Sequence, residues 1–345
     1  MGTRTSDVLR LRLSAQRIAS RAPALDPPGL VRHLLAMQAQ DFGQALWAIG
    51  VRSPGSTRSS VLAALESGEI VRSSPLRGTL MWVAAEDLGW MLGVTAERSI
   101  RSSRTRHRQL GLDEDVFAAA RRVAELRLPG SPVTRDELFA ALNERGIDTS
   151  GQRGYHIIWY LAQTGVLCWG PPKGTQQALV LLDEWVPEPR RLARDEGLAE
   201  LARRYFTSRG PATLRDFAWW AQLTLADAEA GLAASAEHLT EVGDGLWTGA
   251  AEAALAPASL GSRAIALPGF DEYLLGYRDR PHPLAAEHSD RIVPGGNGVF
   301  LPTIIVRGRV VGTWRREKSV VEPEFFEREA DVAAAARAYA RFVEG

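Results

Sequence analysis

The sequence contains one cysteine, two lysines and no long apolar run, and each scarcity narrows what the protein can be. Cys168 is the only thiol among 345 residues, which excludes a disulfide framework within the chain and favours a reducing compartment. It also excludes a cysteine-rich zinc or iron–sulfur site, and the six histidines lack a ligand spacing such as HExxH. We therefore expect no metal and no cofactor. The absence of an eighteen-residue apolar run and of a signal-peptide pattern predicts a cytoplasmic protein without a membrane partner.

Positive and negative charges balance, with 41 basic and 41 acidic residues. Proteins that bind nucleic acid usually carry a basic excess, so the net charge argues mildly against that function. The basic residues are nevertheless clustered in two places, at Arg98, Arg101, Arg104, Arg106 and Arg108, and at Arg307, Arg309, Arg315, Arg316 and Lys318. Such a cluster is either a solvated face, which is the commoner case, or an anion-binding surface.

The first well-defined helix is predicted over 27–38. Asp26 is suited to cap its first turn, and the two prolines that follow fit that turn. Leu30, Leu34 and Gln38 follow at a spacing of four, which places them on one face of the helix. Gln38 is therefore predicted to lie on the buried face of the helix, together with the two leucines.

Gln38 and Gln40 flank one small apolar residue at the end of this predicted helix. On a continuing helix Gln40 points away from Gln38, so both face one site only if the helix ends or unwinds here, as Gly43 allows. An unpaired buried amide costs about 1–3 kcal/mol. The two amides are therefore either bonded to nearby backbone, as most buried amides are, or kept for a function.

A recurring order of elements, two helices and then a two-stranded wing, predicts winged helix-turn-helix units. The central copy is clearest, because Thr134 and Glu137 form a capping box that begins a helix. Its elements are helices over 134–145 and 152–163 and strands over 166–169 and 178–182. A second copy has helices that begin at 213 and 224 and strands over 239–242 and 246–248. A looser N-terminal copy has helices over 7–20 and 27–38, the segment 60–67, and strands over 69–73 and 79–83.

The pattern changes after about residue 250, where a small β-barrel or sheet domain is predicted. A short strand is expected over 263–267, and the runs 300–306 and 309–315 form the strongest hairpin signal. They meet at Arg307 and Gly308, where the glycine supplies the positive φ of a tight turn. A long loop over 281–298 and a final helix over 324–344 complete this part.

Several separated blocks resemble the AlkZ/YcaQ-like family of winged-helix DNA glycosylases. They are the segment of Gln38 and Gln40, FDEYLLGYR at 270–278, PGGNGVFLP at 294–302 and RGRVVGTW at 307–314. The resemblance covers essentially the whole chain. It implies an α+β fold of three tandem winged helix-turn-helix units and a C-terminal β-barrel, C-shaped around a central DNA channel. The expected divisions are 1–125, 126–190, 191–250 and 251–345, the first carrying the Gln-x-Gln segment and the last the DNA-facing hairpin.

The resemblance implies a monofunctional DNA glycosylase that excises bulky N7-alkylguanine and, in some members, unhooks interstrand crosslinks. The expected partner is double-stranded DNA with alkylated purines, and the expected setting is a monomer in the cytoplasm, associated with the nucleoid. Gln38 and Gln40 match the family's Gln-x-Gln catalytic form, which is associated with self-resistance to azinomycin-type antibiotics. Glutamine is a poor general base. A cationic base, however, leaves without protonation, so two side-chain carbonyls suffice to orient the attacking water.

Other contacts are expected around this pair. Asp41 is either a source of negative charge for the reaction or, more commonly for such a residue, a helix-terminal or salt-bridging group. Because the hairpin is expected to approach the DNA minor groove, its arginines are candidate DNA contacts, as are the N-terminal wing and the loop over 281–298. The candidates are Arg307, Arg309, Arg315, Arg316, Arg72, Arg77, His282 and His288.

A non-catalytic DNA-binding protein, either a regulator or one that sequesters a lesion or drug, is the competing hypothesis. Winged helices are more often found in regulators than in enzymes, so fold alone favours it. The glutamine pair, the appended barrel and the lack of an evident dimerisation zipper favour the enzyme. The enzyme requires both amides to open onto one positively lined concavity, whereas a regulator tolerates their burial.

Overall fold

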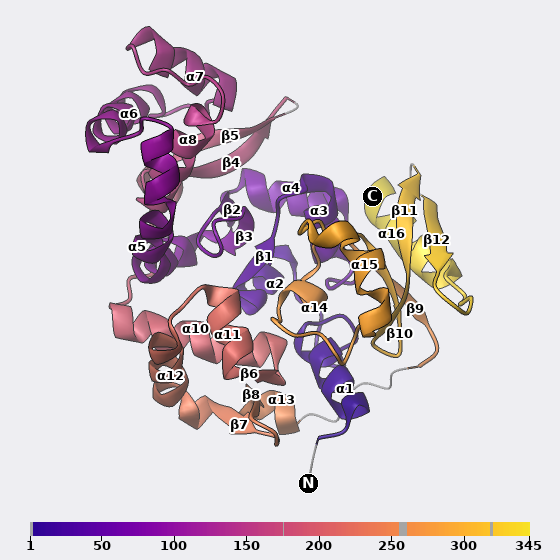
Figure 1. The fold of residues 1–345 in the computed structure, drawn as a ribbon. Helices are drawn as coiled ribbons and strands as arrows, with labels where there is room; N and C mark the ends of the chain where they lie inside the picture. Colours follow the sequence, from indigo (N-terminus) through magenta and orange to yellow (C-terminus); the bar gives the residue numbers. More distant parts are fainter. Residues whose placement is uncertain (1–2, 175, 255–260, 318–319) are drawn as a thin grey trace. The chain divides into compact units, whose positions relative to one another are not determined.

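The computed structural model describes residues 3–174, 176–254, 261–317 and 320–345. These residues form a mixed fold of helices and strands (Figure 1). They group into two compact units. The first unit comprises residues 1–61 and 198–345, and the second comprises residues 62–197. The four-part division expected above stays a prediction.

The second unit is built on four strands in the hydrogen-bonded order β3-β2-β4-β5. Their bounds are β2 Ile70–Ser73, β3 Met81–Ala84, β4 Leu167–Lys173 and β5 Gln176–Leu181. The accompanying helices are α5 Ala85–Gln109, α6 Glu114–Arg127, α7 Arg135–Glu144, α8 Arg153–Gln163 and α9 Leu182–Trp185; α4 Arg58–Glu66 crosses the boundary between the units. Leu138, Leu142, Ile157 and Leu161 of α7 and α8 are fully buried in its hydrophobic core.

The central copy of the predicted pattern is confirmed as a set of elements. The capping box is present, with Glu137 N–H donating to Thr134 Oγ1 at 3.2 Å and Thr134 N–H donating to Glu137 Oε2 at 2.7 Å. Helices α7 and α8 and strands β4 and β5 then follow in the expected order. The long helix α5 and the helix α6 were not predicted, although α5 carries the first arginine cluster.

The first unit contains two sheets, with orders β12-β11-β10-β9 and β6-β8-β7, and the short strand β1. Its strands are β1 Ala36–Gln38, β6 Ala212–Thr213, β7 Leu239–Glu241, β8 Leu246–Gly249, β9 Ala264–Leu267, β10 Thr303–Val306, β11 Arg309–Glu317 and β12 Val320–Phe325. Its helices are α1 Thr5–Ala15, α2 Pro27–Leu34, α3 Phe42–Gly50, α10 Arg194–Arg209, α11 Leu214–Ala221, α12 Leu225–Ala234, α13 Ala250–Ala254, α14 Glu272–Leu275, α15 Ser289–Ile292 and α16 Ala333–Glu344. Three 3-10 turns complete it: η1 Ala236–His238, η2 Ala286–His288 and η3 Pro294–Gly296. Helix α10 begins just before the boundary.

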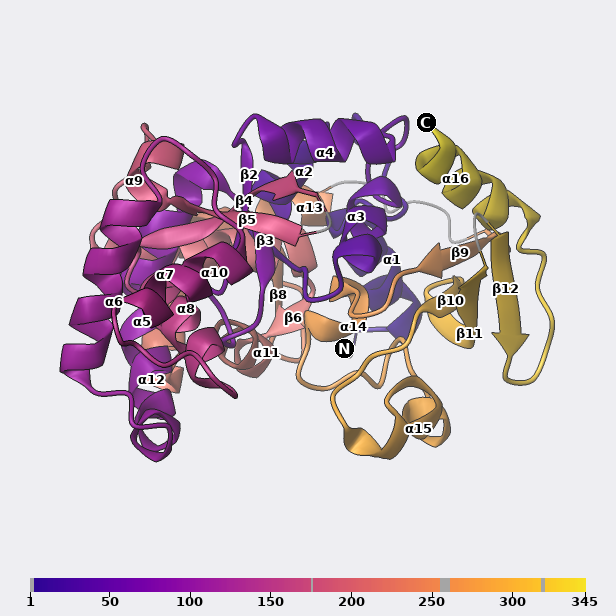
Figure 2. The same ribbon diagram turned by 90° about the horizontal axis from the view of Figure 1, so that it is seen from above.

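The C-terminal sheet carries the predicted hairpin and one element that was predicted wrongly. Val306 pairs with Arg309 across the turn, which confirms the hairpin. The predicted helix over 324–344 begins only at Ala333, because residues 320–325 form the edge strand β12 instead. Helix α16 packs on the sheet through Tyr339, whose ring centroid lies 5.2 Å from that of Trp314 on β11 (Figure 2).

The segment 281–298, predicted as a long loop, contains the short helical pieces η2, α15 and η3. Ile292 of α15 is fully buried, in the same hydrophobic cluster as Leu9, Leu13 and Tyr273. The segment is therefore anchored to the first unit by an apolar contact. Proline, glycine and histidine are frequent in this segment, which is why its composition predicts a loop.

Candidate active site

Gln38 is the last residue of a short strand and Gln40 lies in the bend that follows, so neither lies at the end of a helix. The helix α2 ends at Leu34, four residues before the predicted end, and Leu35 has φ 64° and ψ −55°. Ala36–Gln38 then form the strand β1. The chain leaves the helix before this segment, and the side chains of Gln38 and Gln40 meet. Gln38 Nε2 donates to Gln40 Oε1 at 3.4 Å.

The pair spans the boundary between interior and solvent. Gln38 is 8% exposed, whereas Gln40 and the adjacent Asp41 are exposed. Asp41 caps helix α3, because its Oδ1 accepts the N–H of Gln44 at 3.0 Å. Asp41 therefore has the helix-terminal role weighed above, directly after Gln40 in the chain.

The early end of α2 is explained by two arginines of α10. The last carbonyls of a helix lack partners within it and need other donors. Arg204 donates to the carbonyl of Arg32, and Arg209 Nη1 donates to the carbonyl of Leu34 at 2.7 Å. Arg209 Nη2 donates to the carbonyl of Ala36 at 2.6 Å, so its guanidinium bonds the backbone on both sides of Leu35.

Glu272 connects this arginine to the glutamine pair. Its carboxylate is 2% exposed, and Oε1 accepts the backbone N–H of Gln38 at 3.1 Å. Oε2 accepts from Arg209 Nη2 at 2.9 Å and from Trp220 Nε1 at 2.9 Å. Sequence reasoning included Glu272 in the FDEYLLGYR block but did not single it out. An acidic residue followed by a run of apolar residues was the available signal.

A second buried ion pair lies one residue away in the chain. Arg52 Nη2 and Nη1 donate to the two carboxylate oxygens of Asp271 at 2.7 and 2.8 Å, with the side chains 0% and 1% exposed. Arg52 also donates to the carbonyl of Ala48 and to Gln16 Oε1. This pair joins α3 to the start of α14, and none of its hydrogen bonds named here reaches Gln38 or Gln40.

The arginines predicted on the hairpin strands are exposed. They are Arg307, Arg309, Arg315 and Arg316. The turn itself is packed against the unit, since Tyr273 Oη donates to the carbonyl of Gly308 at 2.7 Å. Arg316 lies close to the glutamine segment: a Cβ built on Gly43 would be 3.8 Å from its Nη1 and 3.6 Å from Asp41 Oδ1. One of the predicted arginines therefore lies beside the first turn of α3. Lys318 lies outside the described residues.

The other candidate contacts are less accessible. Arg72 is 9% exposed and donates to Gln177 Oε1 at 3.0 Å, which gives it a place in the packing of the second unit. Arg77 is half-buried in a turn with φ 54°. His282 is half-buried, and burial, followed by the nearby Arg12 and Arg309, lowers its pKa from the usual value.

His288 lies in a small polar cluster on the first unit. Its Nε2 lies 3.9 Å from Glu287 Oε1 and 3.6 Å from Glu327 Oε1, and its ring centroid lies 4.5 Å from that of Phe326. Among the residues that the structure describes, these three are the group with the spacing to hold a metal ion. Both glutamates are exposed. Exposed acidic groups of this kind are common without a metal, so the cluster is consistent with a surface ion pair.

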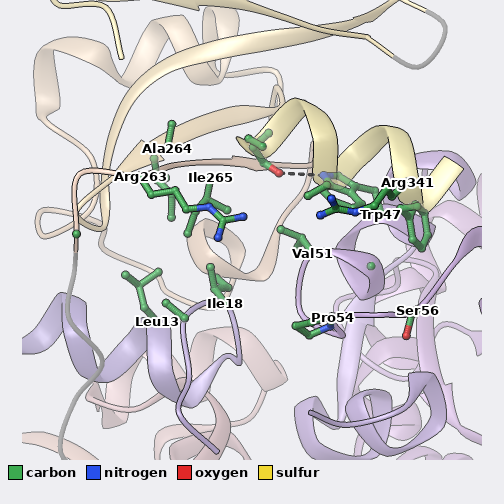
Figure 3. A pocket seen from close by; sticks show the side chains of 18 of the residues that line it. Leu13, Ile18, Trp47, Val51, Pro54, Ser56, Arg263, Ala264, Ile265 and Arg341 are labelled. Carbon is green, nitrogen blue, oxygen red and sulfur yellow. Dashed lines mark hydrogen bonds between the residues drawn. The ribbon is translucent and has the colours of Figure 1, made fainter. Parts of the chain in front are cut away.

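A cavity of about 800 Å³ lies elsewhere in the first unit (Figure 3). Its wall is largely apolar and includes Ile18, Trp47 and Ile265, with Arg341 at one side. The indole of Trp47 is fixed, because its Nε1 donates to the carbonyl of Ala266 at 2.9 Å. Neither glutamine of the pair is among the described residues that line this cavity, so it carries no part of the candidate chemistry.

Comparison with known proteins assigns the family. The family described as "DNA glycosylase AlkZ-like" matches residues 31–342. An interstrand DNA cross-link repair glycosylase of Streptomyces sahachiroi is 27% identical over 311 residues, covering 83% of this chain and 81% of the relative.

A solved structure of the Streptomyces sahachiroi DNA glycosylase AlkZ shares the fold, with a TM-score of 0.81 at 24% identity, covering 99% of this chain and 98% of that one. No described helix is both long enough and apolar enough to cross a membrane. The family match extends over most of the chain and includes the glutamine pair, the buried glutamate and the hairpin. The chain therefore belongs to the AlkZ-like family of DNA glycosylases.

Proposed function

We propose that the protein is a monofunctional DNA glycosylase that releases cationic N7-alkylguanine from duplex DNA, using Gln38 and Gln40. The observation that carries this proposal is the pairing of two amides where the strand β1 ends, with 3.4 Å between Gln38 Nε2 and Gln40 Oε1. One amide is buried and the other is exposed, so the pair faces a region that DNA can reach.

Release of a cationic base requires an oriented water molecule more than it requires a basic side chain. Alkylation at N7 places a positive charge on guanine, so the bond from C1′ to N9 breaks with its electron pair moving onto the base. The side-chain carbonyls of Gln38 and Gln40 orient a water whose oxygen bonds to C1′, and they present partial negative charge to the oxocarbenium-like sugar. The proton of that water passes to bulk solvent. No amine takes part, so the DNA strand stays intact at the abasic site.

The proposed substrates are bulky and cationic. The relative from Streptomyces sahachiroi is named for interstrand cross-link repair, and a crosslink through N7 of guanine has the same cationic leaving group. We include such crosslinks among the substrates, in DNA repair or in self-resistance to a genotoxic natural product. A monomer working on double-stranded DNA is the proposed assembly. The exposed arginines of the hairpin strands, and Arg316 above all, supply phosphate contacts near the pair.

The test is release of the free base from duplex DNA that carries one N7-methylguanine, or one bulky N7-guanine adduct. The wild-type chain is compared with Gln38→Ala and Gln40→Ala under single-turnover conditions, with DNA affinity measured in parallel. Gln44→Ala is the matched control, because Gln44 lies in the same segment but its Oε1 accepts the N–H of Gly269. We expect each pair variant to lose about 10²-fold or more in the release rate while binding DNA.

Each other result decides against part of the proposal. Release by both pair variants at the wild-type rate would remove the glutamines from the mechanism. DNA binding by the wild type with no release of either adduct would favour the competing hypothesis of a non-catalytic protein that sequesters lesions. Equal release of uracil, a neutral base, would contradict the role assigned to the positive charge of the base.

A further inference from the structure

The backbone that carries the glutamine pair is strained at one residue. Leu35 has φ 64° and ψ −55°, close to the centre of a classic γ-turn, and its side chain is fully buried. A branched residue in this conformation costs about 1–3 kcal/mol and persists only where the surroundings over-determine it. Glycine would adopt the turn without this cost, yet the chain has leucine there, three residues before Gln38. The strained turn therefore needs an external restraint.

Arg209 supplies that restraint with two of its donors, and the rest hold its guanidinium in place. A guanidinium has five N–H donors in a rigid fork. Nη1 donates to the carbonyl of Leu34 and to Ser208 Oγ at 3.0 Å, Nη2 to the carbonyl of Ala36 and to Glu272, and Nε to Glu272 at 3.2 Å. The two carbonyls lie one residue before and one residue after Leu35, so the guanidinium restrains the peptide that precedes the strained residue and the peptide that follows Ala36.

Glu272 extends the restraint two residues further along β1, to Gln38. One carboxylate oxygen accepts from Arg209 and Trp220, and the other accepts the N–H of Gln38. The guanidinium of Arg209 also lies over the Trp220 ring, with its Cζ 4.2 Å from the ring centroid. The two charges are buried and neutralise each other. Together, the side chains of Arg209 and Glu272 bond the backbone of Leu34, Ala36 and Gln38.

We propose that Arg209 and Glu272 are positioning residues for the reaction, which hold β1 in the conformation that brings the side chains of Gln38 and Gln40 together. This inference rests on the proposed function. Neither residue contacts DNA in this account; each acts through the backbone of the strand. A reacting water oriented by two amides is sensitive to this restraint, because a misplacement of about 1 Å costs about 10²-fold in rate.

The pair Arg52–Asp271 provides a matched comparison. It is as buried as Arg209–Glu272, it also contains two hydrogen bonds between guanidinium and carboxylate, and the acidic residues Asp271 and Glu272 are adjacent in the chain, yet none of its hydrogen bonds described above reaches β1. Arg209→Lys and Arg52→Lys each keep the buried positive charge but replace the planar guanidinium by a single ammonium group. A lysine has one nitrogen and cannot bridge the carbonyls of Leu34 and Ala36.

The experiment measures the single-turnover rate of N7-methylguanine release, the affinity for the same duplex and the melting temperature of each variant. We expect Arg209→Lys to slow release by about tenfold or more at unchanged DNA affinity. We expect Arg52→Lys to lower the melting temperature comparably and to change the rate by less than about threefold. Glu272→Gln and Asp271→Asn form a second matched pair with the same expectation. Trp220→Phe, which removes a single donor to Glu272, gives a milder variant if Glu272→Gln does not fold.

A double-mutant cycle separates positioning from general loss of structure. If Arg209 acts through Gln38, then Arg209→Lys has little further effect in the Gln38→Ala background, because the oriented group is already absent. Equal losses of rate in both backgrounds, or equal losses in the Arg209 and Arg52 variants, would overturn the inference. A wild type that releases no base would instead contradict the proposed function, and the two failures are therefore distinguishable.

Discussion

Two ion pairs in different units show how differently a buried and an exposed charge affect the local backbone conformation. In the first unit, the side chains of Arg209 and Glu272 are 0% and 2% exposed, and they bond to irregular backbone around Leu35. In the second unit, Lys173 and Glu137 are 45% and 39% exposed, and their 2.9 Å contact joins residues of β4 and α7. The exposed pair supports a helix that its own capping box already specifies, whereas the buried pair determines a conformation that local sequence disfavours.

The same contrast extends to the interiors of the units. The core cluster of the second unit consists of apolar side chains on regular helices and strands, whose backbone groups bond to each other. The described interior of the first unit includes Arg12, Arg52, Arg209, Asp271 and Glu272, whereas the second unit buries fewer charged side chains, Arg72 and Asp87. Buried charge is expensive, so we infer that the larger share in the first unit is kept because side chains there bond backbone carbonyl and N–H groups.

The largest expected effect comes from breaking the buried pair. Glu272→Ala leaves the guanidinium of Arg209 buried without its counter-charge, and we expect it to lower the free energy of unfolding by about 3–5 kcal/mol. Urea denaturation followed by circular dichroism measures this. Lys173→Ala is the comparison variant in the second unit, where we expect little change because both partners are largely solvated. Similar losses from the two substitutions would remove the distinction drawn here.

Acid is expected to weaken the first unit through His33 of α2. Its Nε2 lies 2.7 Å from the carbonyl of Ala15, and burial lowers its pKa from 6.5 to about 4, with only partial compensation by this hydrogen bond. Below pH 6.5 the unfolded chain takes up a proton that the folded chain does not, so stability falls as the pH drops toward 4 and then levels. The loss from this group reaches about 3 kcal/mol.

Unfolding free energies measured from pH 7.5 to pH 4 test this expectation in the wild type and in His33→Gln. The substitution keeps a donor for the carbonyl of Ala15 but removes the titration, so the curve of the variant is expected to be flatter over that range. Identical pH profiles would show that His33 is not the group responsible. Burial also lowers the pKa of His107 in the second unit, so a residual slope in the variant is expected.

The smallest expected effect is local to the second unit. Thr134→Ala removes the cap of α7, and we expect it to lower the free energy of unfolding by about 1 kcal/mol. Thr134→Ser, which keeps the hydroxyl, is the matched control and should lose only a few tenths of that amount. A loss as large as that of Glu272→Ala would mean that the second unit also depends on a few polar contacts.

The sequence predicted which residues form the glutamine pair but not the backbone that presents them. Proline, a capping aspartate and leucines at a spacing of four all favour a helix that continues to Gln38. The groups that end it at Leu34 are Arg204 and Arg209, which lie about 170 residues away in the chain. A pattern within a short window contains no information about such donors, so the tertiary contact overrides the local preference.

The errors at the C-terminus and in α5 also have physical causes. The final helix was predicted to begin at 324, whereas residues 320–325 form β12, an edge strand in which Pro323 is tolerated because an N–H can be missing there. The hairpin turn at Arg307 and Gly308 was predicted correctly, because a tight turn is encoded by adjacent residues. Helix α5 contains Gly89 and Gly93, which weaken the helical signal, and its arginines were considered only as a charge cluster.

The most direct test of the central claim is mass-spectrometric detection of free base after one turnover on a duplex with a single N7-methylguanine. A duplex with uracil at the same position is the matched neutral substrate. The account predicts free N7-methylguanine from the wild type, an intact abasic strand, no release of uracil, and loss of release in Gln38→Ala and Gln40→Ala. Bound DNA with no free base from the wild type, or undiminished release by the two variants, would contradict it.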